Sequence, residues 1–443
     1  MVRGGQGSVA GRHSMVAPAT RLAGCRCRAG DGRAPAGYVW WDRRRPPTGA
    51  RHSGRGWQGY RFSNAFGFRL LPFRGFPVIL AWMVRFPAWM LTMVFLVLLA
   101  LLPGERPRRF RAGEPLQVRT INPKMGVHTR LTDEVEEGKI ARTLQMVREL
   151  GAPWVVEYFP WAYSEPAKGH FNFAHAEMVI EHAYAEGLQV IARLDYVPDW
   201  ARPKDTTARY LDPSRYADYG EFVYAFVDHF KDRVHYYIIW NEPNMAAEWG
   251  FRPVSPQEYT ALLQVAYTRA KEADPSAVIL AAGLAPTLEQ DSATAMNDLA
   301  YLQSMYDAGA APYFDALAIH AYGGRFPPDD APAPDRLNFA RAELIRQVMV
   351  RNGDAAKPAF ITEAGWNDHP HWTRAVRPAQ RIAYTIRAFQ KAQDEWPWCQ
   401  AVALWTFRYP RPVSGYQAYY TLVSQDFTPK PIYLEIQRYA QGR

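Results

Sequence analysis

Two glutamates occupy the positions in this sequence that are best suited to acid–base chemistry. Glu242 lies within Trp240–Asn244 (WNEPN), directly after an apolar run of β-branched and aromatic residues that predicts a buried strand. Pro243 has no N–H and cannot continue a strand, so Glu242 is expected where the strand opens into a loop. Glu363 holds the same kind of position in Phe360–Trp366 (FITEAGW). Both carboxyls are therefore expected at strand ends, held rigidly yet able to meet a ligand.

Two carboxyls that meet at one ligand suit the hydrolysis of a glycosidic bond. The leaving oxygen needs a proton, and the oxocarbenium-like centre needs stabilisation by a second carboxylate. A separation of about 5 Å predicts a covalent intermediate and retention, whereas a wider gap admits water and predicts inversion. The two environments must differ, so that one carboxyl stays protonated near neutral pH. For either glutamate alone, a structural ion pair is the alternative.

The elements that must position these glutamates alternate between strand and helix from about residue 118. The predicted strands are 124–128, 154–158, 189–194, 234–240, 278–282, 314–320, 359–362 and 402–407. The predicted helices, with apolar residues three and four apart, are 133–150, 174–186, 217–230, 256–273, 293–308, 335–351, 378–394 and 429–439.

Eight strands, each followed by a helix, predict an α/β fold of the (β/α)₈ TIM-barrel type over residues 118–443. An open doubly wound sheet is the alternative, but no glycine-rich phosphate loop follows the first strand. In a barrel, strands four and seven face each other across the mouth. Glu242 and Glu363 are then expected to converge.

The N-terminal part of the chain has a different composition. Residues 1–111 hold 19 arginines, no lysine and three acidic residues, whereas the remainder holds 33 basic and 40 acidic residues. We interpret residues 1–82 as disordered or as wrongly assigned coding sequence, with translation starting at Met83. The basic charge of the chain thus belongs to this segment, and we expect no nucleic-acid partner for the main domain.

An apolar segment follows that is typical of a signal peptide or membrane anchor. Residues 83–103 combine a short basic start with an uncharged run, 86–102, and residues 104–117 form a linker. The arginines after the run favour keeping that flank inside, which argues against simple export. We expect an exported or membrane-anchored protein with its main domain outside the cytoplasm, tethered through 86–102 if the run is not cleaved.

Cysteines and histidines do not indicate a metal site. Cys25 and Cys27 have the wrong spacing for the usual zinc pairs, and Cys399 stands alone. His369 and His371 lack carboxylate or cysteine partners at ligand spacing. We predict no metal and no cofactor.

The sequence resembles the retaining glycoside hydrolases of clan A, most closely family 39 and its family 5-like relatives. The resemblance covers roughly residues 120–440 and rests on Trp240–Asn244, Ile361–Trp366 and Phe314–Tyr322. It implies that Glu242 is the general acid/base and that Glu363 is the nucleophile.

The resemblance also implies roles for neighbouring residues. Asn241 would bind the 2-hydroxyl of the sugar, and His320 and Tyr322 would orient the nucleophile. A core histidine is the alternative for His320. Clan A enzymes commonly carry an arginine on strand two, which this sequence lacks, and Arg193 on strand three is the candidate to supply that charge.

Tryptophans in or beside the loops after the strands are candidates for stacking on sugar rings. Trp405 is expected to form the floor of the −1 subsite, and Trp249 to line the leaving-group side together with Glu248. Trp161 and Trp366 are further candidates. Ordinary packing is the alternative for each.

The predicted function is therefore retaining hydrolysis of a β-linked oligo- or polysaccharide. A non-catalytic carbohydrate-binding barrel and a transglycosylase that uses the same two carboxyls are the alternatives. The sequence leaves the sugar and the oligomeric state open, because loop geometry decides the first.

Overall fold

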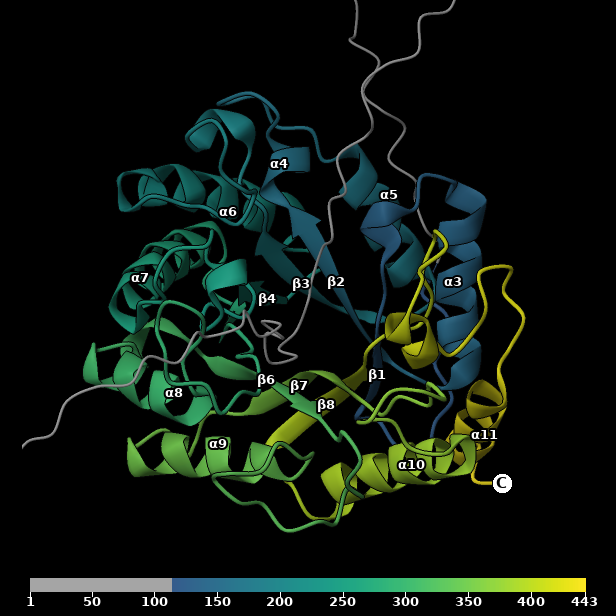
Figure 1. Ribbon diagram of the computed structural model, residues 1–443. Coiled ribbons are helices and arrows are strands. Elements are labelled where there is room, and N and C mark those ends of the chain that lie inside the picture. Colours follow the sequence, from purple (N-terminus) through teal and green to yellow (C-terminus); the bar gives the residue numbers. More distant parts are fainter. Residues whose placement is uncertain (1–113) are drawn as a thin grey trace, which may run out of the picture. The chain divides into compact units, whose positions relative to one another are not determined.

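The computed structural model describes residues 114–443. Within them eight parallel strands close into a barrel in chain order, β1 to β8, and β1 pairs with β8. Figure 1 shows the strands at the centre, with helices around them. The predicted (β/α)₈ TIM barrel is confirmed. The expectations for residues 1–82 and 83–103 lie outside the described residues, and within residues 114–443 no helix is long and apolar enough to cross a membrane.

The strands are short and follow the predicted order. They are β1 Met125–His128, β2 Trp154–Pro160, β3 Gln189–Asp195, β4 Tyr236–Ile239, β5 Val278–Ala281, β6 Ala316–Tyr322, β7 Ala359–Gly365 and β8 Cys399–Leu404. The prediction placed the last strand too late, at 402–407, because the exposed Gln400 interrupts its apolar pattern.

The helices form the outer layer. They are α3 Glu137–Leu150, α4 Trp161–Ser164, α5 Ala174–Ala185, α6 Tyr216–Phe230, α7 Pro256–Ala273, α8 Asp298–Asp307, α9 Arg341–Arg351, α10 Pro378–Asp394 and α11 Pro431–Ala440. Four helices, α3, α8, α9 and α11, begin later than predicted, and the difference is largest for α8 and α9. The side chain of Asn297 caps α8 by accepting from the N–H groups of Leu299 and Ala300, and that of Asn338 bonds to the loop at Asp330 before α9.

Short 3₁₀ helices occur in the connections. They are η1 Leu131–Asp133, η2 Asp199–Ala201, η3 Pro213–Arg215, η4 Ala246–Glu248, η5 Ala311–Tyr313 and η6 Tyr416–Tyr420.

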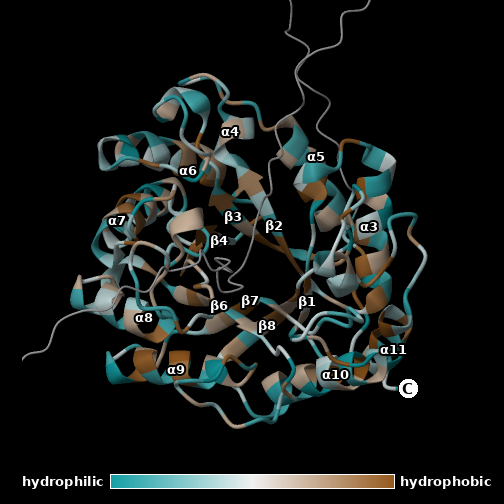
Figure 2. Ribbon diagram, viewed as in Figure 1, coloured by the Kyte–Doolittle hydropathy of each residue, from teal (hydrophilic) through white to brown (hydrophobic). Residues whose placement is uncertain are grey.

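The core has two parts, one between strands and helices and one inside the barrel. Figure 2 shows hydrophobic residues concentrated on the strands and hydrophilic ones on the outer faces of the helices. Inside the barrel, Trp154, Tyr236 and Phe360 meet with ring centroids 5.1–5.7 Å apart. Small residues on β6 and β8 leave room for them. This plug fills the N-terminal half of the barrel, so a ligand can enter only at the other end.

Candidate active site

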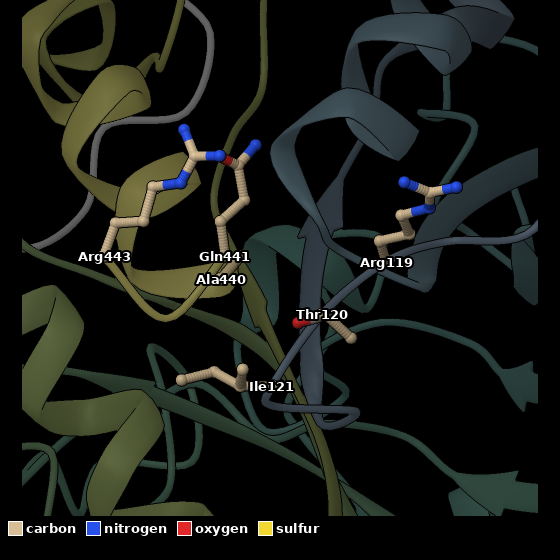
Figure 3. Close-up of a pocket in the computed structure, with 6 residues that line it drawn as sticks. All are labelled: Arg119, Thr120, Ile121, Ala440, Gln441 and Arg443. Atoms are coloured by element: carbon tan, nitrogen blue, oxygen red, sulfur yellow. The ribbon is translucent and has the colours of Figure 1, made fainter.

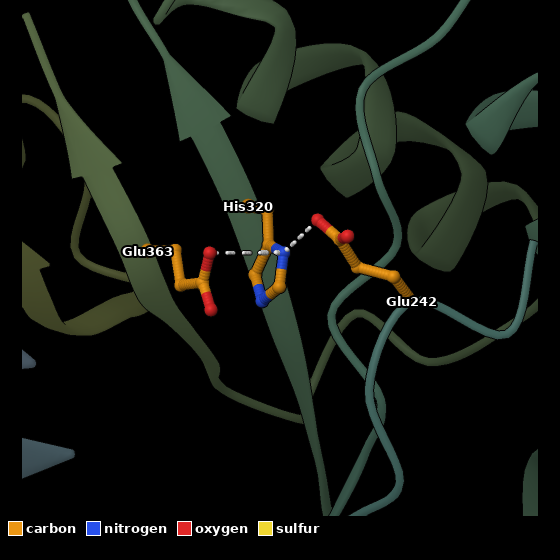
Figure 4. A group of neighbouring side chains, drawn as sticks. All are labelled: Glu242, His320 and Glu363. Atoms are coloured by element: carbon orange, nitrogen blue, oxygen red, sulfur yellow. Dashed lines mark hydrogen bonds and ion pairs between the residues drawn. The ribbon is translucent and has the colours of Figure 1, made fainter. Parts of the chain in front are cut away.

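The barrel brings Glu242 and Glu363 to the same place, at the C-terminal ends of the strands. Figure 4 shows the imidazole of His320 between the two carboxylates. Its Nδ1 lies 2.8 Å from Glu242 Oε1 and 3.7 Å from Glu363 Oε2. One oxygen of each glutamate and a ring nitrogen of His320 all lie within 4.8 Å of one another. That spacing fits a retaining pair, at about 5–5.5 Å, and is too short for an inverting pair, at about 6.5–9.5 Å.

Backbone conformation after β4 turns Glu242 into the barrel mouth. Trp240 and Glu242 have φ angles of 74° and 41°. These angles lie in the left-handed region, which costs conformational free energy in residues other than glycine. Neighbouring loops hold this turn. The N–H of Glu242 donates to the carbonyl of Gly283 at 3.0 Å, and the side chain of Asn244 exchanges hydrogen bonds with the backbone of Ala285.

A β-bulge aims Glu363 in the same direction. Phe360 points into the barrel core, so strict alternation along β7 would turn Glu363, three residues later, outward. The pairing of β6 with β7 steps from Ile319–Ile361 to His320–Glu363, which leaves Thr362 as an extra residue. The bulge therefore brings Glu363 onto the inner face with His320.

The surroundings of Glu363 stabilise a carboxylate anion. Arg193 Nη1 lies 3.1 Å from Oε1, and the hydroxyl of Tyr322 donates to Oε2 at 2.7 Å. Glu363 is buried, so these charge-assisted contacts are not screened by water. Arg193, on β3, thus places a positive charge beside Glu363, as expected from the lack of an arginine on the second strand.

The surroundings of Glu242 favour its protonated form. Burial raises the pKa of this carboxyl, and the nearby charge of Glu363 raises it further, while the hydrogen bond with His320 opposes the shift. Burial also disfavours a charged His320, but Glu363 and Glu242 outweigh it and raise the pKa of the imidazole. The Glu242–His320 pair therefore keeps a proton to higher pH than a free carboxyl would.

Asn241 lies beside the two glutamates with its side chain fixed at both ends. Its Oδ1 accepts from Arg193 Nη1 at 2.9 Å, and its Nδ2 donates to Glu248 Oε2 at 3.1 Å. One N–H of the amide remains for a ligand.

His128 belongs to the site but was not among the predicted residues. It ends β1, and its Nδ1 lies 2.7 Å from the carbonyl of Thr129, which assigns the proton to that nitrogen. Nε2 is buried without a hydrogen-bond partner, 4.0 Å from Glu363. Burial and the neighbouring Arg193 lower the pKa of this imidazole, so it is a neutral acceptor. His128 could have been predicted in the same way as His320, because both are polar residues at or near the C-terminal end of a strand.

Gly283, after β5, was missed as well. A Cβ on this residue would lie 2.3 Å from Cδ2 of His320. The absence of a side chain therefore makes room for the imidazole between the two glutamates. A lone glycine after a strand carries no such signal in the sequence.

Three of the predicted sugar-stacking tryptophans are core residues, and that prediction is wrong for them. Trp161, Trp249 and Trp366 are at most 2% exposed. Trp161 stacks on Phe222, and the indole of Trp366 donates to the carbonyl of Phe326. A ring enclosed by protein on both faces cannot stack on a sugar.

Trp405 follows β8 at the barrel mouth. Its ring packs edge-on against His128 at 4.5 Å, and the guanidinium of Arg130 lies 5.6 Å from its centre. Trp405 is only 4% exposed, and its expected place in the floor of the −1 subsite stays a prediction.

Glu242, His320 and Glu363 form the one group among residues 114–443 whose atoms could converge on a metal ion. Each of the three already has a partner within the site, and the cation of Arg193 contacts Glu363. A dication there would be repelled by that guanidinium. The predicted absence of a metal remains a prediction.

A separate pocket lies at the opposite end of the barrel. Its lining comes from the chain before β1 and from the end of α11: Arg119, Thr120, Ile121, Ala440, Gln441 and Arg443 (Figure 3). Because Arg119, Thr120 and Ile121 precede β1 whereas His128 ends it, the pocket and the glutamates lie at opposite ends of the barrel.

Sequence comparison gives a partial family match. The model of a family described as β-galactosidase, glycoside hydrolase family 42, matches residues 131–212. No curated protein sequence matches the chain.

Solved structures resemble the barrel over most of its length. A family 39 glycoside hydrolase from Bacteroides cellulosilyticus WH2 has 20% identity and a TM-score of 0.60 over 72% of this chain, which spans 64% of that protein. A β-xylosidase from Caulobacter crescentus CB15 has 17% identity and a TM-score of 0.53, covering 72% of this chain and 69% of that one.

A third structure is a family 5 (GH5_18) protein from Streptomyces cattleya in complex with GlcNAc. It has 16% identity and a TM-score of 0.54, covering 72% of this chain and 80% of that one. At these identities the likeness establishes the barrel fold. The predicted resemblance to clan A glycoside hydrolases is confirmed: part of the sequence matches the family 42 model, and the barrel resembles structures of families 39 and 5 in its fold.

Proposed function

We propose that the protein hydrolyses O-glycosidic bonds in a β-linked oligo- or polysaccharide with retention of configuration. The observation that carries the proposal is the close approach of Glu242 and Glu363 in unlike environments. Their nearest oxygens lie within 4.8 Å, one carboxyl shares a proton with His320, and the other contacts Arg193. An acid and an anionic nucleophile at that spacing are what double displacement requires.

In the first step Glu363 attacks the anomeric carbon while Glu242 protonates the leaving oxygen. The aglycone departs and leaves a glycosyl ester on Glu363. In the second step the Glu242 carboxylate deprotonates a water, which attacks the same carbon and frees Glu363. The free N–H of Asn241 would bind the 2-hydroxyl, a contact that strengthens in the transition state.

The chemistry of the remaining polar groups suits a neutral sugar. His128 Nε2 and Arg193 lie around Glu363, and His128 offers an acceptor to a hydroxyl hydrogen. The relatives act on different sugars, as the β-xylosidase and β-galactosidase names show. We therefore propose a β-glycoside without assigning the glycone.

Product stereochemistry tests this proposal. Proton NMR should show the β-anomer forming first from 4-nitrophenyl β-xyloside, β-galactoside or β-glucoside, and Glu363→Gln should lower kcat by about 10⁴-fold or more. Initial formation of the α-anomer would contradict double displacement. Transfer to an added sugar acceptor in place of water would instead assign transglycosylation. Saccharide binding without turnover by the unaltered protein would assign a binding barrel.

We also propose that the protein is exported or membrane-anchored through residues 86–102. The support is the uncharged run after Met83 and Arg85. N-terminal sequencing of the native protein should find a start at or after Met83, and a peptide that contains Trp40 and Trp41 would contradict that start.

A further inference from the structure

A series of mostly buried charged side chains extends from Glu363 through Arg193. Arg193 Nε is 3.0 Å from Asp195 Oδ2, and Arg209 Nη1 donates to the same oxygen at 2.8 Å. Arg209 Nε is in turn 2.9 Å from Glu248 Oε2. The signs alternate from Glu363 through two arginines and an aspartate to Glu248, which offsets the cost of burying each charge.

This series of charged side chains closes into a ring through the amide of Asn241. Glu248 Oε2 accepts from Nδ2 of Asn241, and Arg193 Nη1 donates to Oδ1. A flipped amide would place its N–H groups against the guanidinium and its oxygen against the carboxylate, so both contacts would become repulsive. The ring therefore selects one orientation of Asn241, with a single N–H left over for a ligand.

Most members of the ring are buried and packed, and the side chain of Glu248 is 12% exposed. Asp195 is fully buried, and Arg193 and Arg209 are 5% and 8% exposed. The guanidinium of Arg209 lies 3.8 Å from the centre of the Tyr196 ring, which holds it in plane. Arg209 comes from the connection after β3, whereas Glu248 ends η4 after β4. The ring thus joins two loops that are separate in the chain.

We propose that Glu248 and Arg209 are positioning residues that act on the reaction through Asn241 and Arg193. They hold the amide so that its free N–H meets the 2-hydroxyl of the sugar, and they hold Arg193 against Glu363. This proposal rests on the proposed glycoside hydrolysis and extends it to two residues of the neighbouring loops. Asp195 is the link between the two arginines.

A double-mutant-type cycle, in which the enzyme is mutated and the 2-hydroxyl is removed from the substrate, tests the positioning role of Glu248 and Arg209. The measurement is the ratio of kcat/KM for a 4-nitrophenyl β-glycoside to that for its 2-deoxy counterpart. Glu248→Ala should lower this ratio by about tenfold, because the amide is then free to turn away from the 2-hydroxyl. Glu248→Gln should keep most of the ratio, since its amide oxygen can accept from both Arg209 and Asn241.

Arg209→Lys provides a second variant if Glu248→Ala does not fold. A lysine keeps the charge but cannot bridge Asp195 and Glu248 as the forked guanidinium does, so the ratio should fall by about threefold or more. Asp298→Asn is the control, because Asp298 forms a buried ion pair with Arg341, at 2.7 Å, in the helical layer. It should lower Tm and leave the ratio unchanged.

An unchanged ratio in a folded Glu248→Ala or Arg209→Lys protein that still hydrolyses the glycoside would overturn the positioning role alone. Equal ratios in Glu248→Ala and Glu248→Gln, both reduced, would also overturn it, because charge and not the amide contact would then matter. Failure of the unaltered enzyme to hydrolyse every aryl β-glycoside and every β-linked polysaccharide of a broad panel would overturn the glycoside hydrolysis itself.

Discussion

At the scale of single residues, the proposed reaction depends on two glutamates made different by their neighbours. Glu363 is paired with Arg193 and Tyr322, whereas Glu242 faces His320. The sequence suffices to predict both glutamates, because each follows a strand and stands in an unusual string. Arg193 and Tyr322 were also expected beside Glu363, whereas His128, which approaches Glu363 from β1, was not.

The pH dependence of kcat/KM follows from the raised pKa of Glu242. This residue must be protonated in the first step, so kcat/KM should fall as the pH rises through that pKa, and a raised pKa moves the fall to higher pH. A 2,4-dinitrophenyl glycoside needs no proton for its leaving group. With that substrate, Glu242→Ala should retain glycosylation and lose the alkaline fall, and a fall that persists would assign it to another group.

At the scale of elements, local irregularities in the strands and loops point Glu242 and Glu363 into the barrel mouth, which regular strands would not do. The bulge at Thr362 and the left-handed residues Trp240 and Glu242 are examples. The sequence predicts where β4 and β7 lie, because apolar runs define them. It does not reveal the bulge, since an extra residue in a buried strand leaves the apolar pattern intact. Nor do a tryptophan and a glutamate in the sequence give any sign of a positive φ.

The sequence also does not show which way the loop tryptophans point, and this explains why three of them were wrongly predicted to stack on sugars. Trp161, Trp249 and Trp366 stand in or beside loops, where large rings suggested a ligand surface, yet each fills the space between a loop and the helices. Position along the chain does not tell which side of a loop a ring covers. The packing of the helices decides it, because Trp161 contacts Phe222 in α6, Trp249 contacts Tyr259 in α7 and Trp366 contacts Tyr384 in α10.

Gly283 supports a prediction at this scale. In Gly283→Ala the new methyl group would overlap His320 and displace it from between the glutamates, so kcat should fall by about tenfold or more with a small change in Tm. Gly138→Ala is the control, because a Cβ there, in α3, meets nothing within 4 Å. It should preserve kcat, and helix propensity would stabilise the fold by about 0.5–1 kcal/mol. Equal kcat in both variants would show that His320 needs no such room.

At the scale of the whole barrel, closure of the sheet gathers groups from six strands or their connections at one mouth. His128, Arg193, Glu242, His320, Glu363 and Trp405 come from β1, β3, β4, β6, β7 and β8 respectively or the residues just after them. The alternation of strands and helices in the sequence is enough to predict this architecture. The burial of several ionisable groups at that mouth then couples stability to pH.

His128 should contribute to acid sensitivity of the fold. Its folded-state pKa lies well below its usual value of about 6.5, so the unfolded chain binds a proton more readily. Its contribution to the free energy of unfolding is complete above pH 6.5 and is lost as the pH falls below that value. Urea unfolding between pH 7.5 and 5.5 should show a shallower loss in His128→Gln, by up to about 1.4 kcal/mol per pH unit. Identical slopes for the two proteins would contradict the neutral, buried state of His128.

The central claim is that Glu363 forms a covalent bond to the sugar beside Glu242. Incubation with a 2,4-dinitrophenyl 2-deoxy-2-fluoro-β-glycoside, followed by digestion and mass spectrometry of the peptides, tests it most directly, because the fluorine slows hydrolysis of the intermediate. We predict one fluoroglycosyl group per chain, on the peptide that contains Glu363, with no label in Glu363→Gln. A label on a different carboxylate of an active enzyme, or turnover of the parent glycoside with inversion and no label, would contradict the account.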